Sequence, residues 1–365
     1  MLYAGYQAER TAGKTVGKTA SVPPCIHACG RARLPSEQER EVTVATPLDI
    51  AAYSASLVNW SELGHVYCFG NGKGGVGKTT CTCNIGGLAA ADGLRVLIVD
   101  LNVQGNVAEE LGYAETELDD EGKGLLTAIT LQEAVKPIRN VRPNLDVVPG
   151  GRLLRRVPGI IGSPINDQER AAAVLTLARI LQPVAKEYDL ILIDSPPENE
   201  HMMQLALGAA RWVVVPVKSD KSSRKKGLKA LATDYAAMRQ YNPYVTLLGA
   251  ILFATGANAT AIRKTVRDDV EATLGGSAPI FDNVIRFAEA VAVAARDRGK
   301  LVYELEAAAS ENPEFWKIRA GLADASQVVS KTSASVSEDF AVVARELFTR
   351  AATVQNEMIQ EGVWP

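Results

Sequence analysis

Two lysines five residues apart mark the stretch of this 365-residue chain that could do chemistry. Residues 72–79 read GKGGVGKT and fit the pattern GxxxxGK[ST], with an apolar segment before them and a helical pattern after them. Glycines in such a loop let backbone N–H groups and a helix N-terminus surround a phosphate chain. We therefore expect Lys78 to reach the terminal phosphates of a nucleotide and the Thr79 hydroxyl to bind Mg²⁺.

A carboxylate that could support the same metal ion closes another apolar segment. Asp194 ends the run LILID, at residues 190–194. A carboxylate at the end of a strand can hold Mg²⁺ through its water shell. Asp194 taken alone could equally be a structural cap, but together with the glycine-rich loop it predicts a metal-supporting role.

The second lysine of the loop needs a different explanation. Lys73 lies five residues before Lys78, where its side chain would point out across the phosphates. If two copies of the chain meet face to face, each Lys73 could reach the nucleotide of the other copy. A cation about 4 Å from a phosphate is worth roughly 4 kcal/mol at an effective dielectric near 20, and could also stabilise charge that develops during phosphoryl transfer. The alternative is a solvated loop lysine.

The elements that must position these residues follow one pattern from His65 onward. Short β-branched runs alternate with helical patterns. Strands are expected at 65–70, 95–100, 145–149, 190–194, 212–217 and 245–253, with a short one near 280, and helices at 79–91, 168–186, 201–210, 224–240, 259–274 and from about 286. Apolar strands without strict alternation predict an α/β fold, a mainly parallel twisted sheet with helices on both faces, as in P-loop NTPases.

The chain divides into three parts by composition. Residues 1–60 predict a flexible extension with a possible short helix over 49–63, because they hold scattered Gly, Pro, Ser and Thr. Residues 61–304 form the expected ATPase domain. Residues 305–365 hold a polar segment and then a helix at about 336–358, packed on that domain. We expect no zinc site at Cys25 and Cys29, and we regard the loop-like GKTVGKT at 13–19 as chance.

Charge and hydropathy limit the classes of partner. The formal net charge of −3 does not indicate a general nucleic-acid binder, so affinity for DNA would need a local basic patch. The sequence has neither a signal-peptide layout nor an apolar run long enough to span a bilayer. We therefore expect a cytoplasmic protein that does not enter a membrane.

Four segments together resemble the ParA-type partition ATPases, members of the deviant Walker A class that includes MinD. They are KGGVGKTT at 73–80, VDLNVQGN at 99–106, DSPP at 194–197 and RFAEA at 286–290, and the resemblance covers about residues 64–300. It implies that ATP with Mg²⁺ closes a homodimer, which binds DNA non-specifically on the nucleoid. A ParB-like centromere-binding partner would stimulate ATP hydrolysis and release. The cycle would segregate a plasmid, phage or chromosome.

The resemblance also implies roles for individual residues. Lys73 corresponds to the signature lysine that reaches across the dimer, and catalysis would involve Lys73, Lys78, Asp100 and Asn102. Asp194 and Thr79 would serve the metal ion. The ATP-binding residues implied by position are Gly72, Lys73, Gly74, Gly75, Val76, Gly77, Lys78, Thr79 and Thr80.

One departure from the family pattern affects hydrolysis. The family usually has an Asp that orients the attacking water where this chain has Asn102. An amide can hydrogen-bond a water molecule but cannot accept its proton or supply negative charge. Because positioning does much of the work in phosphoryl transfer, we expect weak hydrolysis to persist, with Asp100 as a partial substitute. The rival interpretation is an ATP-gated DNA-binding scaffold that barely hydrolyses ATP.

A second departure is the basic segment 218–229, which holds six cations and one Asp. Cations at the start of a helix oppose its dipole, which favours a functional role over a merely solvated helix end. We predict contact with the DNA backbone through this segment and the helix that follows it. The candidates are Lys221, Arg224, Lys225, Lys226, Arg263, Lys264 and Arg267.

A positioning ATPase of the MinD kind remains a further alternative. It would need an amphipathic membrane-targeting helix at the C-terminus. The last helical pattern carries Phe340, Val343, Leu347 and Ala351 at helical spacing, but its polar face is not strongly basic. We therefore expect this helix to pack on the core or to support a dimer.

Overall fold

The computed structural model describes residues 49–162, 164–197, 199–220, 226–255, 260–274, 280–286, 288–320, 322 and 328–365. The predictions for Cys25, Cys29 and residues 13–19 lie outside the described residues. The first described element is the helix α2 (Ile50–Leu57), which begins at the capping side chain of Asp49 within the segment expected to hold a short helix.

An eight-stranded sheet organises the described chain. Its order is β3-β4-β2-β5-β1-β6-β7-β8, and all neighbours are parallel except the edge pair β3 and β4. The strands are β1 (Val66–Phe69), β2 (Val96–Asp100), β3 (Ile138–Arg142), β4 (Leu145–Val148), β5 (Leu190–Asp194), β6 (Trp212–Val217), β7 (Thr246–Thr255) and β8 (Ile285–Arg286). The predicted α/β fold with a mainly parallel sheet is confirmed.

Helices bury both faces of this sheet, which explains the absence of polar alternation in its strands. In β1, Val66 and Cys68 belong to one apolar core, while Tyr67 and Phe69 belong to the core on the opposite face. The first core is covered by helices that include α5 (Lys123–Leu131), α7 (Asp167–Val174), α8 (Thr176–Ala185), α9 (Glu200–Ala209), α10 (Leu228–Met238) and α11 (Thr260–Leu274). The second is covered by α3 (Lys78–Ala91), α4 (Asn106–Glu110), α12 (Glu289–Arg298), α13 (Val302–Ser310) and α15 (Thr332–Gln360).

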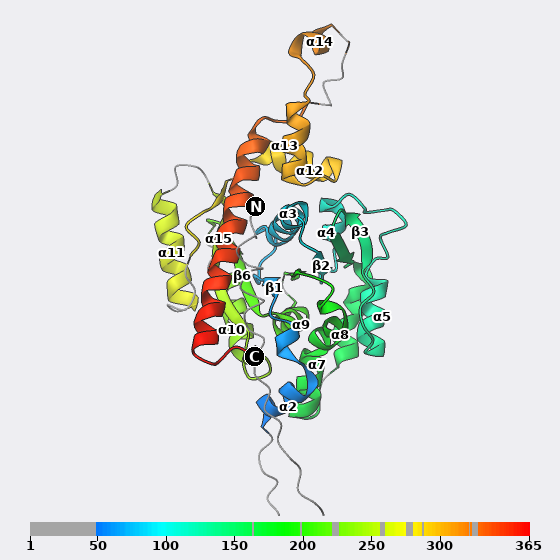
Figure 1. Ribbon diagram of the computed structural model, residues 1–365, viewed down its shortest axis with the longest axis vertical. Helices are drawn as coiled ribbons and strands as arrows, with labels where there is room; N and C mark the ends of the chain where they lie inside the picture. Colours follow the sequence, from blue (N-terminus) through cyan, green and yellow to red (C-terminus); the bar gives the residue numbers. More distant parts are fainter. Residues whose placement is uncertain are drawn as a thin grey trace, which may run out of the picture.

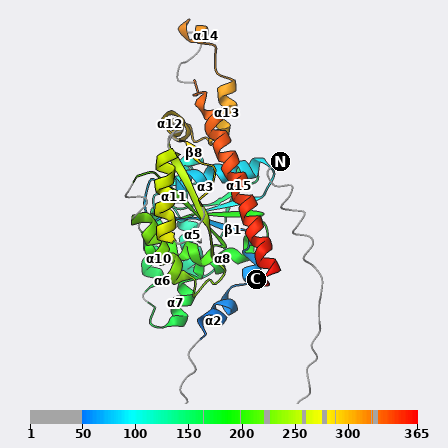
Figure 2. The same cartoon turned by 90° about the vertical axis from the view of Figure 1, so that its left-hand side faces the viewer.

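The long helix α15 packs on the core along its apolar side. Its residues Phe340, Val343, Leu347 and Ala351 are all buried in the second core. Figure 1 shows α15 beginning next to α13, below the projecting helix α14 (Phe315–Arg319), and running beside the sheet towards the C-terminus, and Figure 2 shows its full length. No helix among the described residues is long and apolar enough to cross a bilayer.

A cation held by aromatic rings fixes the segment that follows α15. The Cζ atom of Arg211 lies 4.3 Å from the ring centroid of Trp364 and 5.0 Å from that of Trp212, and the two indole rings stack. Burial lowers the pKa of Arg211 to about 10, so its guanidinium stays charged at neutral pH. Cation–π contacts of this kind gain strength from desolvation.

Several predicted elements were wrong in detail. The helix expected at 168–186 is two helices, α7 and α8, which meet at a turn at Leu175. The polar segment at 305–335 carries most of α13 and all of α14, and α15 already begins at Thr332. Ile280 makes only an isolated bridge to Ala250, and the last strand is β8. The edge strand β3 was missed because its sequence, IRNVR, is charged and partly exposed, as edge strands commonly are.

Candidate nucleotide-binding site

The glycine-rich loop joins β1 to α3 at the carboxyl edge of the sheet, where open α/β sheets bind ligands. Gly77 has a φ of +94°, and a Cβ built there would lie 2.5 Å from the ring of Phe253, so the position requires glycine. Lys78 opens α3 and is only 5% exposed. Its Nζ donates a hydrogen bond to the carbonyl oxygen of Lys73 at 2.8 Å, which folds the loop around the ammonium group.

Sheet register brings the metal-binding candidates together. The Thr79 hydroxyl donates to Oδ2 of Asp194 at 2.6 Å, although the two residues are 115 positions apart. The other carboxylate oxygen of Asp194, Oδ1, is buried and has no hydrogen-bond partner in the described structure. Hydroxyl and carboxylate oxygens are the ligands that Mg²⁺ prefers. An unpaired buried carboxylate oxygen beside a hydroxyl therefore fits a divalent cation.

A second carboxylate lies next to Asp194. Asp100 ends β2 directly opposite Asp194 in the parallel β2–β5 pair, and both residues are fully buried. Burial raises the pKa of Asp194 to about 7. Burial, followed by the charge of Asp194, raises the pKa of Asp100 well above its ordinary value. A cation at this point would offset the repulsion between two acidic groups in a low-dielectric environment.

The loop after β2 is ordered by Asp100 and Asn102. Asp100 accepts backbone hydrogen bonds from Asn102 at 2.7 Å and from Val107 at 3.3 Å. The side-chain oxygen of Asn102, which is 4% exposed, accepts from the backbone N–H of Gln104 at 3.0 Å. Both side chains thus hold the loop that starts α4. Their participation in hydrolysis stays a prediction.

Lys73 lies at the exposed rim of the loop. Its Nζ forms an ion pair with Asp220 of the same chain at 3.1 Å, and the side chains are 33% and 48% exposed. Its backbone N–H donates to the side chain of Asn71, whose amide in turn donates to the carbonyl of Pro216 in β6. Sequence reasoning missed Asn71 and Asp220, although each follows a strand at the same sheet edge.

One further loop contact was not foreseen. The hydroxyl of Thr80 donates to Oε1 of Glu110 at 2.8 Å, and Glu110 is buried at the end of α4.

A cavity of about 550 Å³ opens on the other side of the loop, lined by residues that include Gly72, Glu200 and Asp234. Burial and the charge of Glu200 raise the pKa of Asp234 to about 6.

The predicted DNA contacts are described only in part. Lys221, Arg224, Lys225 and the side chain of Arg263 lie outside the described residues. The described members are Lys226, just before α10, and Lys264 and Arg267 on α11, and all three are exposed. Helices α10 and α11 pack against each other at one end of the sheet (Figure 1). The structure therefore places Lys226 just before one helix, and Lys264 and Arg267 on the helix that packs against it.

Comparison with known proteins shows which family the chain belongs to. A family model described as "AAA domain" matches residues 64–246. The chain is 34% identical to the chromosome-partitioning ATPase Soj of Thermus thermophilus, over 60% of this chain and 82% of that protein. It is 29% identical to the chromosome partitioning protein ParA of Myxococcus xanthus, over 60% of this chain and 74% of that protein.

The chain belongs to the ParA-type P-loop ATPases. A solved structure of a Cyanothece McdA variant in complex with ATP has the same fold, with a TM-score of 0.56 at 18% identity, covering 78% of this chain and 96% of that one. The family model and the Soj relative confirm the predicted family. Within this ParA-type chain, the roles of the individual loop residues stay predictions from the sequence motif and the family resemblance.

The paired carboxylates predict a pH-dependent effect of Asp194→Asn, measured by chemical denaturation in EDTA without nucleotide. Because the folded-state pKa of Asp194 is raised, the folded chain binds its proton more tightly and loses stability as the pH rises from about 4 to about 7. The variant should therefore be more stable than the parent by roughly 1–3 kcal/mol at pH 8. The difference should vanish near pH 4.

The matched control is Asp268→Asn, at an exposed position on α11. It should change the free energy of unfolding by less than about 0.5 kcal/mol at both pH values. Equal stability of Asp194→Asn and the parent at pH 8 would show that burial does not raise the pKa of Asp194 in the folded chain.

Proposed function

We propose that this chain is an ATP-dependent partition protein whose ATP-bound homodimer binds DNA non-specifically. Partner-stimulated ATP hydrolysis then releases the dimer from the DNA. The observation that carries the proposal is Lys73, held at the exposed rim of the nucleotide loop instead of within it. The ParA and Soj relatives, named for chromosome partitioning, support the same role. Its place of action would be the nucleoid in the cytoplasm, and its partner a ParB-like centromere-binding protein.

The ion pair between Lys73 and Asp220 is weak enough to exchange. Both side chains are partly exposed, and such pairs contribute only about 0.2–1 kcal/mol. A triphosphate offers several negative charges, and the attraction grows where a second copy excludes water. Lys73 would leave Asp220 for the phosphates of the other subunit when two copies meet. Asp220 therefore competes with the nucleotide of the other subunit for the ammonium group of Lys73, and so opposes dimer formation.

Other side chains of the site would bind the phosphates of ATP and the Mg²⁺ ion. Lys78 would bind the terminal phosphates, because its ammonium already donates a hydrogen bond to a carbonyl of the loop, that of Lys73. Mg²⁺ would be held by Thr79 and, through water, by Asp194, whose Oδ1 lacks a partner in the described structure. When bound, the ion neutralises charge on the transferring phosphoryl group. The chain's own part is to hold the Thr79 and Asp194 oxygens in place and to exclude water around them.

Hydrolysis is proposed to be slow because Asn102 cannot accept a proton. Its side chain already accepts a hydrogen bond from Gln104, which limits its freedom to orient a water molecule. This observation also supports a second candidate, an ATP-gated scaffold that binds DNA and barely turns over ATP. A MinD-like role is less well supported, since the apolar side of α15 is buried in the core.

The first prediction concerns dimer formation, measured by light scattering with a non-cleavable ATP analogue and Mg²⁺. Lys73→Ala should leave the chain monomeric, because the cation that reaches the other nucleotide is gone. Asp220→Asn should dimerise at an about two- to thirtyfold lower protein concentration, because formation of one dimer breaks two such ion pairs, each worth about 0.2–1 kcal/mol. The control is Lys136→Ala, at an exposed position outside the site. A parent chain that stays monomeric when saturated with the analogue would overturn the proposal.

The second prediction concerns turnover, measured as phosphate release with DNA and partner present. Asn102→Asp should raise the rate by about tenfold or more, because a carboxylate can orient and deprotonate the attacking water. Gln104→Glu places a carboxylate at an exposed position in the same loop and should leave the rate unchanged. If Asn102→Asp has the parental rate, position 102 does not limit hydrolysis. If the parent shows no turnover at all, the scaffold function is favoured.

The third prediction concerns DNA retention in the ATP-bound state. Combining Lys264→Glu with Arg267→Glu should weaken DNA binding at least about tenfold. The affinity should also depend less steeply on salt concentration, because fewer phosphate contacts release fewer counterions on binding. A double variant with Lys136→Glu and Lys186→Glu makes the same change in net charge at exposed sites elsewhere. Equal weakening by both pairs would show that only overall charge matters and would exclude α11 as the DNA contact.

A further inference from the structure

A buried carboxylate that the proposed mechanism does not use contacts the nucleotide loop. Glu110 is 5% exposed and accepts the hydroxyl hydrogen bond of Thr80, the residue after the metal-binding threonine. Its nearest described cation is Arg296 of α12, whose Nε lies 3.9 Å from Oε1 and whose side chain is 63% exposed. Burial raises the pKa of Glu110, while the Thr80 hydrogen bond and the charge of Arg296 act in the opposite direction.

The hydroxyl of Thr80 has one proton and can donate it only once. In the structure it donates to Glu110, so the same proton is not available to a phosphate oxygen. Glu110 also brings negative charge to the first turn of α3, where the helix dipole and backbone N–H groups otherwise favour an anion. Both effects oppose a nucleotide phosphate at this end of the loop.

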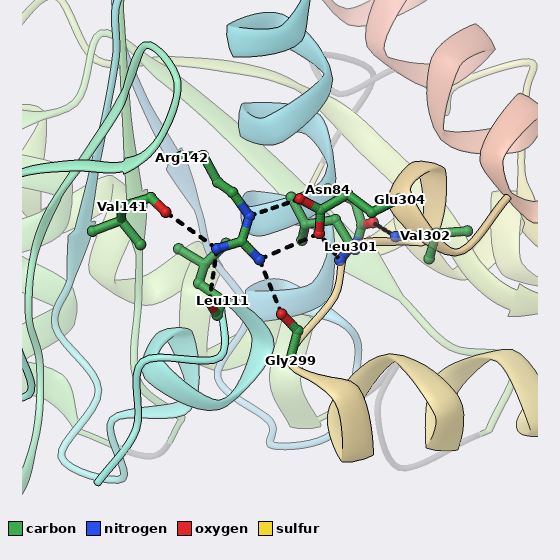
Figure 3. Close-up of polar contacts among 8 residues, drawn as sticks. All are labelled: Asn84, Leu111, Val141, Arg142, Gly299, Leu301, Val302 and Glu304. Carbon is green, nitrogen blue, oxygen red and sulfur yellow. Dashed lines mark hydrogen bonds and ion pairs between the residues drawn. The ribbon is translucent and has the colours of Figure 1, made fainter. Parts of the chain in front are cut away.

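The end of α4 has little freedom to move Glu110 away. Arg142 donates to the carbonyl of Leu111, just after α4, and to the carbonyl of Gly299, just after α12, and it pairs with Glu304 of α13 (Figure 3). Gly112 and Gly299 meet so closely that a Cβ on Gly112 would lie 2.7 Å from the carbonyl oxygen of Gly299.

The same cluster extends to α3. Asn84 of α3 accepts a hydrogen bond from the backbone N–H of Val302, at the start of α13 (Figure 3). Its side-chain amide also donates to the carbonyl of Thr80. The helices α3, α4, α12 and α13 are therefore joined as one unit. Within that unit, Oε1 of Glu110 contacts both the hydroxyl of Thr80 and the surface cation Arg296.

We propose that Glu110 is a positioning residue that restrains Thr80 and weakens nucleotide binding, and that Arg296 relieves this restraint by offsetting its charge. The inference rests on the proposed binding of ATP at this loop. In this proposal the contacts of Arg296 with Glu110 and of Glu110 with Thr80 connect the surface of α12 to the phosphate site, and Arg296 is the exposed end. A ligand that draws Arg296 away from Glu110 would lower the affinity for nucleotide.

A double-mutant cycle tests the proposal, with dissociation constants of ATP and ADP measured on the full chain by titration of a fluorescent nucleotide. Glu110→Gln should tighten binding about three- to tenfold, because it removes the charge and weakens the hold on the Thr80 proton. Arg296→Ala should weaken binding about twofold to threefold in the parent. The same change should have no effect in the Glu110→Gln background.

Two controls separate this link from general charge effects. Glu109→Gln removes an exposed carboxylate next to Glu110, and Lys300→Ala removes an exposed cation just after α12; neither should change the dissociation constants. Additive effects of Glu110→Gln and Arg296→Ala, or a folded Glu110→Gln variant with parental affinity, would overturn the proposal. If Glu110→Gln does not fold, an Arg296→Ala variant with parental affinity would overturn it alone.

The outcome also distinguishes this inference from the proposed function. A parent chain that binds no ATP would overturn both. Tight ATP binding that is insensitive to position 110 would overturn only the role of Glu110. A purely structural role would lower the stability of the Glu110 variants but would not make the effect of Arg296→Ala depend on the residue at position 110.

Discussion

Two acidic groups buried side by side are the constraint on which the site depends. The pairing of β2 with β5 sets Asp100 opposite Asp194, and both carboxylates are fully buried at the ends of their strands. Each is stabilised through specific partners: backbone N–H groups for Asp100 and the hydroxyl of Thr79 for Asp194. Removing a charge from water without full compensation is costly, so a cation bound beside the two carboxylates would stabilise them.

That constraint explains why the surrounding glycines and the loop geometry matter. A Cβ on Gly150 would meet the carboxylate of Asp100 at 2.6 Å, so the segment after β4 can approach the site only through glycine. The backbone carbonyl of Asn102 accepts a hydrogen bond from the N–H of Gly151, and its side-chain oxygen accepts one from the N–H of Gln104. The loop that would position water is thus tied to the carboxylates themselves. A cation bound at these carboxylates would therefore lie beside the same hydrogen bonds that hold this loop.

Sequence reasoning could predict what depends on local pattern. The glycine spacing before Lys78 specifies the loop, and apolar strands separated by helices specify a parallel sheet buried on both faces. Asp194 was identifiable because parallel strands end at one edge, where a terminal carboxylate must lie near the loop. The contacts of Lys73 with Asp220 and of Thr80 with Glu110 were not accessible, since they join residues 147 and 30 positions apart through tertiary packing. Neither partner belongs to a periodic or motif-like pattern.

The same packing joins the loop to a carboxylate of the chain at each of its two ends. On one side Lys73 is held by Asp220 after β6, and on the other Thr80 is held by Glu110 after the loop that follows β2. Both connections pair a loop group that should serve phosphate with a carboxylate of the chain itself. A phosphate bound at either end of the loop would therefore compete with an internal acceptor, and the two acceptors differ in kind. The exposed pair with Asp220 is weak and screened by salt, whereas the buried contact with Glu110 is shielded from solvent and fixed by the Arg142 cluster. Affinity at the rim should accordingly depend on ionic strength, while affinity at the Thr80 end depends on the packing of α4 against α12.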